Sequence, residues 1–243
     1  MNAQRPAAVH VAENLEELSR LAGEAVIQAA RDAIARRGRF GLALAGGRTP
    51  RRLYEWLGAE AGANMPWHQV HLFWSDERCV PPHDPHSNYR MARRGLIDRV
   101  PIPARNVHRI RGEQEPVEEA AVEYERALRD FGPLDLVLLG LGADGHTASL
   151  FPGHPALEER ERWVRAVPER LGQPPCPRVT LTLVALGEAH QAFFLAAGRE
   201  KRGVVRAVVE GQPPAAPLPA ARVRPQRPPV WFVDEAAWGE CGG

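Results

Sequence analysis

An uninterrupted apolar stretch near the middle of the chain, residues 136–139, ends abruptly at two glycines, Gly140 and Gly142. A run without polar residues is typical of a strand that is covered on both faces, as in a parallel sheet. Glycine lets the backbone turn tightly after such a strand because it has no Cβ atom. Asp144 and His146 follow the turn, at the strand's carboxyl end, where open α/β sheets bind ligands. This stretch therefore predicts an α/β fold with candidate functional residues at the carboxyl end of a strand.

Similar strands alternate with amphipathic helices along the rest of the chain. We expect strands at residues 9–11, 39–45, 70–74, 107–110, 163–167, 178–183, 192–197 and 230–233. We expect helices at residues 14–37, 51–57 and 116–131, one that contains residues 204–208, and a short one after residue 233. In the first helix Asn14 is the expected N-cap and Gly38 the expected stop. This alternation predicts a three-layer αβα sandwich around a mostly parallel, Rossmann-like sheet, in a single domain that spans residues 1–243.

Composition excludes several classes of partner. The 243 residues carry a net charge of +1, so neither nucleic acid nor an acidic membrane surface is expected as a partner. No apolar stretch approaches the length of a membrane span, and the N-terminus lacks the apolar core of a signal peptide. The three cysteines are scattered and odd in number, which predicts a reducing, cytoplasmic location. They are Cys79, Cys176 and Cys241.

The glycine-rich turn near the middle of the chain allows other interpretations. The spacing of its glycines matches a dinucleotide-binding fingerprint, but Pro152 and Pro155 interrupt the long helix that should follow. A serine-hydrolase elbow would place glycines two residues on either side of the nucleophile, and Ser149 lacks them. In a purely structural interpretation, Asp144 caps a helix and His146 is a surface residue.

A second strand end has the features of a phosphate site. The strand at residues 39–45 runs into Gly46, Gly47, Arg48 and Thr49, just before the expected helix. Glycines let the backbone approach an anion, and the free N–H groups of a helix N-terminus point towards it. The alternative is an ordinary turn in which Thr49 caps the helix.

The strand at residues 70–74 ends in a third polar group. Two carboxylates and a guanidinium follow it: Asp76, Glu77 and Arg78. They predict either a site or a salt-linked loop. Zinc binding by Cys79, His83 and His86 is disfavoured because the prolines among them keep the loop extended and no fourth ligand follows at useful spacing.

Three strings of sequence, taken together, resemble a known family. They are LALAGGRTPRRLYEWL, SDERCVPPHDPHSNYRMARRGLI and GLGADGHTASLFPG. All three are similar to motifs of the 6-phosphogluconolactonases, which form a wider group with the glucosamine-6-phosphate deaminases. The similarity extends over roughly residues 9–238. It implies hydrolysis of 6-phospho-D-glucono-1,5-lactone to 6-phosphogluconate, in the oxidative pentose phosphate pathway.

The resemblance also implies a role for individual residues. The phosphate-binding residues would be Gly46, Gly47, Arg48, Thr49, Arg178 and Lys201, the last of which is the single lysine of the chain. The catalytic residues would be His146, Asp144, Arg78 and Asp76. His146 would transfer protons, Asp144 would orient its ring or position substrate hydroxyls, and Arg78 would stabilise the oxyanion.

The same resemblance implies a simple set of partners. We expect a sugar-phosphate substrate, no metal, no cofactor, and a monomer or weak homodimer. One alternative is a hexosamine-6-phosphate deaminase or isomerase, although that branch usually has tyrosine where Arg78 stands. The other is a non-enzymatic sugar-phosphate sensor, disfavoured because no helix-turn-helix module fits before residue 9.

Overall fold

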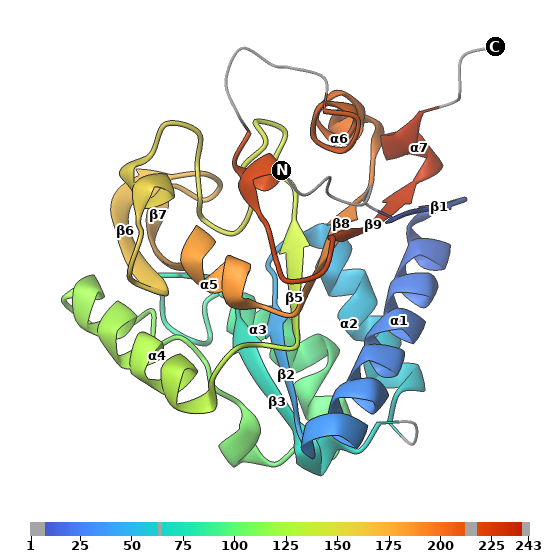
Figure 1. Cartoon of the computed structure of the whole chain (residues 1–243). Helices are drawn as coiled ribbons and strands as arrows, with labels where there is room; N and C mark the ends of the chain where they lie inside the picture. Colours follow the sequence, from blue (N-terminus) through green and yellow to red (C-terminus); the bar gives the residue numbers. More distant parts are fainter. Residues whose placement is uncertain (1–7, 63–64, 212–217, 240–243) are drawn as a thin grey trace.

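A computed structural model describes residues 8–62, 65–211 and 218–239 (Figure 1). Its centre is a sheet of six strands, in the order β1-β9-β8-β5-β2-β3, and all neighbouring pairs in it are parallel. The strands are β1 (Ala8–Ala12), β2 (Phe40–Leu44), β3 (Val70–Trp74), β5 (Leu136–Gly140), β8 (Gln191–Ala196) and β9 (Val230–Asp234). The predicted parallel sheet is confirmed.

Helices cover both faces of this sheet. Figure 1 shows α1 and α2 on one side and α4 and α5 on the other. The helices are α1 (Leu15–Arg37), α2 (Arg48–Glu60), α3 (Asn88–Gly95), α4 (Val117–Phe131), α5 (Leu183–Glu188), α6 (Arg202–Val209) and α7 (Glu235–Trp238). Short 3₁₀ turns are Trp67–Gln69, Ile97–Arg99, Ala104–Asn106, Pro155–Glu158, Arg199–Lys201 and Pro219–Arg222. The expected three-layer αβα sandwich is confirmed.

Helix α1 begins and ends where the sequence predicts. The Asn14 side chain accepts hydrogen bonds from the backbone N–H groups of Glu16 and Glu17, both at 3.0 Å. The two glutamates also place negative charge at the positive end of the helix dipole. Gly38 ends the helix with a φ of 74°, a left-handed conformation that favours glycine.

The apolar run that predicted the fold lies at its centre. Residues 136–139 are fully buried in β5, between β2 and β8. Full burial of one such side chain stabilises the fold by about 1.5–3 kcal/mol. On the neighbouring strands β8 and β9, the Phe194 and Trp231 rings stack with centroids 4.2 Å apart.

A second, antiparallel sheet lies beside the first, in the order β4-β7-β6. Its strands are β4 (Asp76–Arg78), β6 (Val164–Leu171) and β7 (Cys176–Leu181). The strands expected at residues 163–167 and 178–183 are therefore present, although the second ends at Leu181 because α5 begins at Leu183. The alternative of a salt-linked loop is wrong for residues 76–78, because they pair as β4 with β7, which is distant in the sequence.

Two further details differ from expectation. Residues 107–110 form no strand, because a single bridge joins Val107 to Leu72 before the chain turns away. Helix α5 was not predicted.

The proline-rich connection at residues 211–229 lies partly outside the described residues, and Cys241 lies wholly outside them. None of the helices in the described ranges combines the length and apolarity that crossing a bilayer requires.

Candidate active site

The order of the strands determines where a ligand can bind. From β2 the chain proceeds to β3 on one side, and from β5 it proceeds to β8 on the other. Strands β2 and β5 are adjacent, so the crevice at their carboxyl ends is the switch point at which open α/β sheets bind ligands. The chain after β2 and the end of β5 approach each other closely, since a Cβ atom on Gly140 would lie 3.7 Å from the Gly46 carbonyl oxygen.

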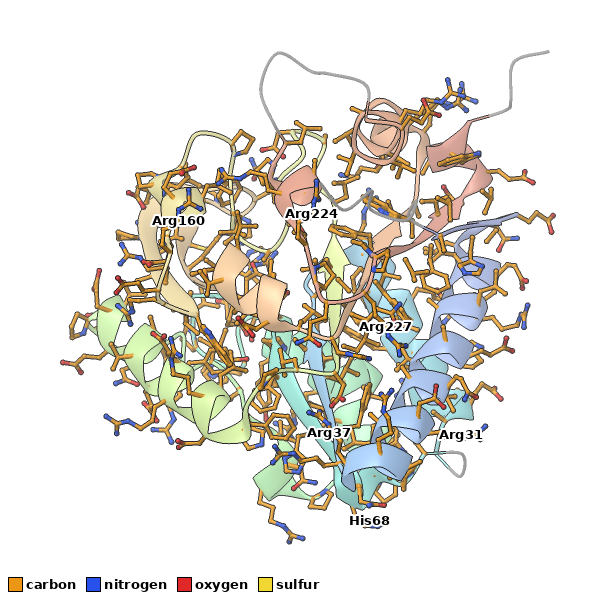
Figure 2. All side chains as sticks on the ribbon, viewed as in Figure 1. Arg31, Arg37, His68, Arg160, Arg224 and Arg227 are labelled. Carbon is orange, nitrogen blue, oxygen red and sulfur yellow. The ribbon has the colours of Figure 1, made fainter. Side chains whose placement is uncertain are left out.

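A cavity of about 1390 Å³ lies at this switch point. All ten site residues predicted from the sequence line it: Gly46, Gly47, Arg48, Thr49, Asp76, Arg78, Asp144, His146, Arg178 and Lys201. Figure 2 shows Arg37 and His68 at the far end of the sheet, by the amino ends of its strands. There Arg37 pairs with the buried Asp135, a structural contact outside the cavity.

His146 and Asp144 form a hydrogen-bonded pair in the loop after β5. Nδ1 of His146 lies 2.5 Å from Oδ1 of Asp144, and the His146 backbone N–H donates to the same oxygen at 3.2 Å. A carboxylate only accepts hydrogen bonds, so Nδ1 carries a proton, and Nε2 has a free lone pair in the neutral form of the ring. Burial raises the pKa of Asp144, but attraction and hydrogen bonds from His146 outweigh it, and the net pKa is lowered.

A tight turn holds this pair in place. The N–H of Gly142 donates to the His146 carbonyl at 2.8 Å, and the N–H of Gly145 donates to the Gly142 carbonyl at 3.0 Å. A Cβ atom on Gly142 would lie 2.1 Å from Nδ1 of His146, so only glycine lets the imidazole fold back here. On its other side the ring contacts Phe151, with centroids 4.7 Å apart. No α-helix follows Asp144, so the interpretation of this residue as a helix cap is wrong.

The N-terminus of α2 faces the cavity without a side-chain cap. Gly47 is the N-cap, with a φ of 103°, and the helix begins at Arg48, not at residue 51. Thr49 lies one residue further on, so the alternative in which it caps the helix is wrong. Gly46 packs tightly against Asn88, since a Cβ atom at this position would lie 2.3 Å from the Asn88 side-chain oxygen. This end of α2 offers backbone N–H groups and positive potential to an anion.

Asp76 and Arg178 form a buried pair at the base of the cavity. Nη1 of Arg178 lies 3.6 Å from Oδ2 of Asp76, and both side chains are nearly inaccessible to solvent. Arg178 also donates to the carbonyls of Leu171, at 3.2 Å, and Pro174, at 3.0 Å. A guanidinium has five N–H groups, so Arg178 keeps donors for a ligand.

Arg78 and Lys201 add positive charge at two further points of the cavity. Nη1 of Arg78 donates to the His86 carbonyl at 2.5 Å, while its Nε has no hydrogen-bond partner among the described residues. Lys201 ends the 3₁₀ turn that precedes α6. Nearby, Nη2 of Arg48 lies 3.2 Å from Oε1 of Glu200, and this exposed ion pair connects the α2 end to the Lys201 turn.

Several residues that support the site had no predicted role. The Ser149 hydroxyl donates to Oδ2 of Asp76 at 2.7 Å, and the Asn88 amide donates to the Asp76 carbonyl at 2.9 Å. Glu77 accepts the backbone N–H groups of Asn88, at 2.7 Å, and Tyr89, at 2.8 Å. Burial raises the pKa of Glu77 to about 6. Two of them had a signal in the sequence: Glu77 belongs to the polar group after β3, and Asn88 follows the helix-capping Ser87.

The described residues contain no group of three or more His, Cys, Asp or Glu side chains arranged to hold a metal ion. The site therefore combines a histidine–carboxylate pair with an uncapped helix end and several cations in one cavity. Such a site can transfer a proton and hold an anion.

Comparisons with known proteins identify the family of the chain. Residues 13–233 match the family described as glucosamine-6-phosphate isomerases/6-phosphogluconolactonase. The chain is 39% identical to a 6-phosphogluconolactonase from Nostoc sp., over 86% of this chain and 87% of the relative. It is 40% identical to the 6-phosphogluconolactonase from Homo sapiens, over 98% of this chain and 95% of the relative.

A solved structure is similar over nearly the whole chain. The 6-phosphogluconolactonase from Thermotoga maritima superposes with a TM-score of 0.84 at 33% identity, and the match covers 94% of this chain and 99% of that one. The fold, the cavity and these matches agree: the chain belongs to the family of glucosamine-6-phosphate isomerases and 6-phosphogluconolactonases.

Proposed function

We propose that this protein hydrolyses 6-phospho-D-glucono-1,5-lactone to 6-phospho-D-gluconate. The observation that carries the proposal is the His146–Asp144 pair, which shares one cavity with an uncapped helix end and the single lysine. The names and high identity of the relatives support the same reaction. A lactone with a distant phosphate needs these two functions, proton transfer at the ring and charge recognition at the phosphate.

In the proposed mechanism, Nε2 of His146 takes a proton from water as the water oxygen attacks the lactone carbonyl carbon. The bond between that carbon and the ring oxygen then breaks, and the imidazolium returns its proton to the departing oxygen. Asp144 fixes the tautomer of His146 and stabilises its cation, since its oxygen lies 2.5 Å from Nδ1. Such acid–base help contributes about 10²–10⁴-fold, which suits an already activated ester.

We assign the phosphate to the opposite end of the cavity. The proposed ligands are the backbone of Gly46 and Gly47, the N-terminus of α2 at Arg48 and Thr49, and the cations Arg178 and Lys201. Arg78 would stabilise the oxyanion, because this cation lines the same cavity as His146. Asp76 would be a positioning residue, because it contacts Ser149, Asn88 and Arg178.

The wider setting of the reaction is also a proposal. We place the enzyme in the cytoplasm, in the oxidative pentose phosphate pathway, as one domain and as a monomer or weak homodimer. The mechanism uses water and side chains alone, so it requires neither a metal nor a nucleotide.

The decisive experiment compares the two activities of the family. Acid release from enzymatically generated 6-phosphogluconolactone would be titrated, with the spontaneous rate subtracted, and ammonia from glucosamine 6-phosphate would be measured in parallel. We expect fast lactone hydrolysis and no ammonia, because Arg78 would repel a protonated amino sugar. Steady ammonia release with lactone hydrolysis no faster than buffer would identify a deaminase instead.

A further inference from the structure

A second cavity, which we call the basic groove, has an unusual concentration of positive charge. It lies between α2 and α3, beside the proposed active site, and has a volume of about 560 Å³. Six arginines and one glutamate supply its charge: Arg48, Arg51, Arg78, Arg90, Arg94, Arg99 and Glu55. Six positive charges less one negative charge give +5, whereas the whole chain carries only +1.

Three of these arginines belong to the basic groove alone. Arg90, Arg94 and Arg99 do not line the proposed active site, and no carboxylate in the described part of the chain forms an ion pair with any of them. Arg90 and Arg94 lie four residues apart on α3, so they share a helix face and repel each other. By contrast, Arg93 on the same helix pairs with Asp98 at 3.1 Å. Unpaired charge is therefore concentrated on the groove side of α3.

The walls of the basic groove are held in fixed contact. A Cβ atom on Gly58 of α2 would lie 2.3 Å from the Gly95 carbonyl oxygen of α3, and one on Gly95 would lie 3.1 Å from Cβ of Tyr54. The two helices therefore touch directly at the floor. The first N–H groups of α3 donate to the buried Glu77, so guanidinium groups, not the helix end, face a ligand here.

We propose that the basic groove binds an oligophosphate, an anion with two or more linked phosphate groups. The planar guanidinium fork matches phosphate oxygens in geometry and charge. One phosphate monoester carries a charge of about −1.5 to −2 at neutral pH, too little to neutralise the +3 of Arg90, Arg94 and Arg99. The groove volume lies within the range of small-molecule sites. Inorganic oligophosphates and nucleoside di- or triphosphates share this chemistry.

The test measures binding to the full chain by calorimetry and does not depend on lactone hydrolysis. Tripolyphosphate, pyrophosphate and inorganic phosphate are titrated into the native protein, into Arg94→Gln and into Arg93→Gln. The two substitutions remove the same charge from adjacent exposed positions of α3, so Arg93→Gln controls for net charge. We expect affinity to increase from phosphate to tripolyphosphate, and Arg94→Gln alone to weaken tripolyphosphate binding by about 5- to 20-fold.

Two further titrations, with ADP and with single-stranded DNA, identify the source of the ligand. If ADP binds more tightly than pyrophosphate, the ligand is a nucleotide. If the two bind equally, the ligand is an inorganic oligophosphate, and both outcomes support the proposal. Equal weakening by the two substitutions, or equal affinity for phosphate and tripolyphosphate, would overturn it. A single-stranded DNA that bound more tightly than tripolyphosphate would also overturn it, in favour of nucleic acid.

Discussion

His146 is exposed enough to reach a substrate, yet its orientation is fixed by the Asp144 carboxylate and the Phe151 ring. His146→Gln should therefore lower kcat for 6-phosphogluconolactone by about 10²–10⁴-fold, because glutamine can fill the space but has no basic nitrogen. The melting temperature and KM should change little. Turnover close to that of the native protein would exclude His146 as the proton-transfer group.

Glu200 is a second residue with a testable role, because it pairs with Arg48 at the proposed phosphate end. A bound phosphate would compete with this carboxylate for the guanidinium. Glu200→Gln should therefore lower KM for the phosphorylated lactone by about 2- to 5-fold, as expected for an exposed ion pair. KM for unphosphorylated gluconolactone should stay unchanged.

Glu119→Gln, an exposed substitution on α4, is the matched control for loss of one negative charge. An equal fall in KM in both variants would indicate a general electrostatic effect. An equal fall on both substrates would mean that Glu200 does not act through the phosphate.

The convergence of most predicted site residues on one cavity was predictable from sequence for a physical reason. Parallel strands carry ligands at their carboxyl ends, and polar residues that follow β2, β3, β5 and β8 must meet at one edge of the sheet. The contact between Ser149 and Asp76 was not predictable, because the two residues are 73 positions apart and only the finished fold brings them together. The Arg48–Glu200 pair, 152 positions apart, was hidden for the same reason.

At the scale of elements, the α3 N-terminus depends on Glu77, whose carboxylate accepts three backbone N–H groups and the Ser87 hydroxyl. Burial raises the pKa of Glu77 to about 6 from an ordinary value of 4.5. The folded state therefore takes up a proton at a higher pH than the unfolded chain does. By linkage, the contribution of Glu77 to stability rises as the pH falls through this window.

Glu77→Gln removes this titration. The free energy of unfolding of the native protein should increase relative to that of the variant by up to about 2 kcal/mol as the pH falls from about 7 to about 4.5. Urea unfolding of both proteins at several pH values measures the difference. Parallel pH profiles would show that Glu77 does not titrate in this window.

Elements were predictable where local signals suffice. Helix α1 has its cap, its periodicity and its final glycine within one stretch of sequence, and both of its ends were correct. Strand β4 was missed because three residues contain too little pattern, and its pairing with β7 spans about a hundred positions. The prediction of a strand at residues 107–110 is wrong. An alternation of apolar residues cannot show whether a neighbouring strand is available for pairing along the whole segment.

At the scale of the whole molecule, Asp76 connects three parts of the structure. It belongs to β4 of the small sheet, and it contacts Asn88 at the start of α3 and Ser149 in the loop after β5. Asp76→Asn would leave the buried Arg178 without its counter-ion. The free energy of unfolding should fall by about 3 kcal/mol, as measured by chemical denaturation.

A second variant separates charge from shape. Asp76→Asn combined with Arg178→Met removes both charges, so part of the lost stability should return. If the double variant lost more stability than the two single variants lost together, the ion pair would have no such role.

The pairing of β1 with β9 has a consequence for synthesis. Residues 8–12 are synthesised more than 200 residues before the strand beside them in the sheet, Val230–Asp234. The edge of β8 also stays open until β9 arrives. Until Val230–Asp234 are synthesised, β1 and β8 therefore lack the strand that they share, and unpaired strand edges of this kind favour aggregation. Pairing with β9 completes both β1 and β8, so the nascent chain should need protection by chaperones until that strand has been made.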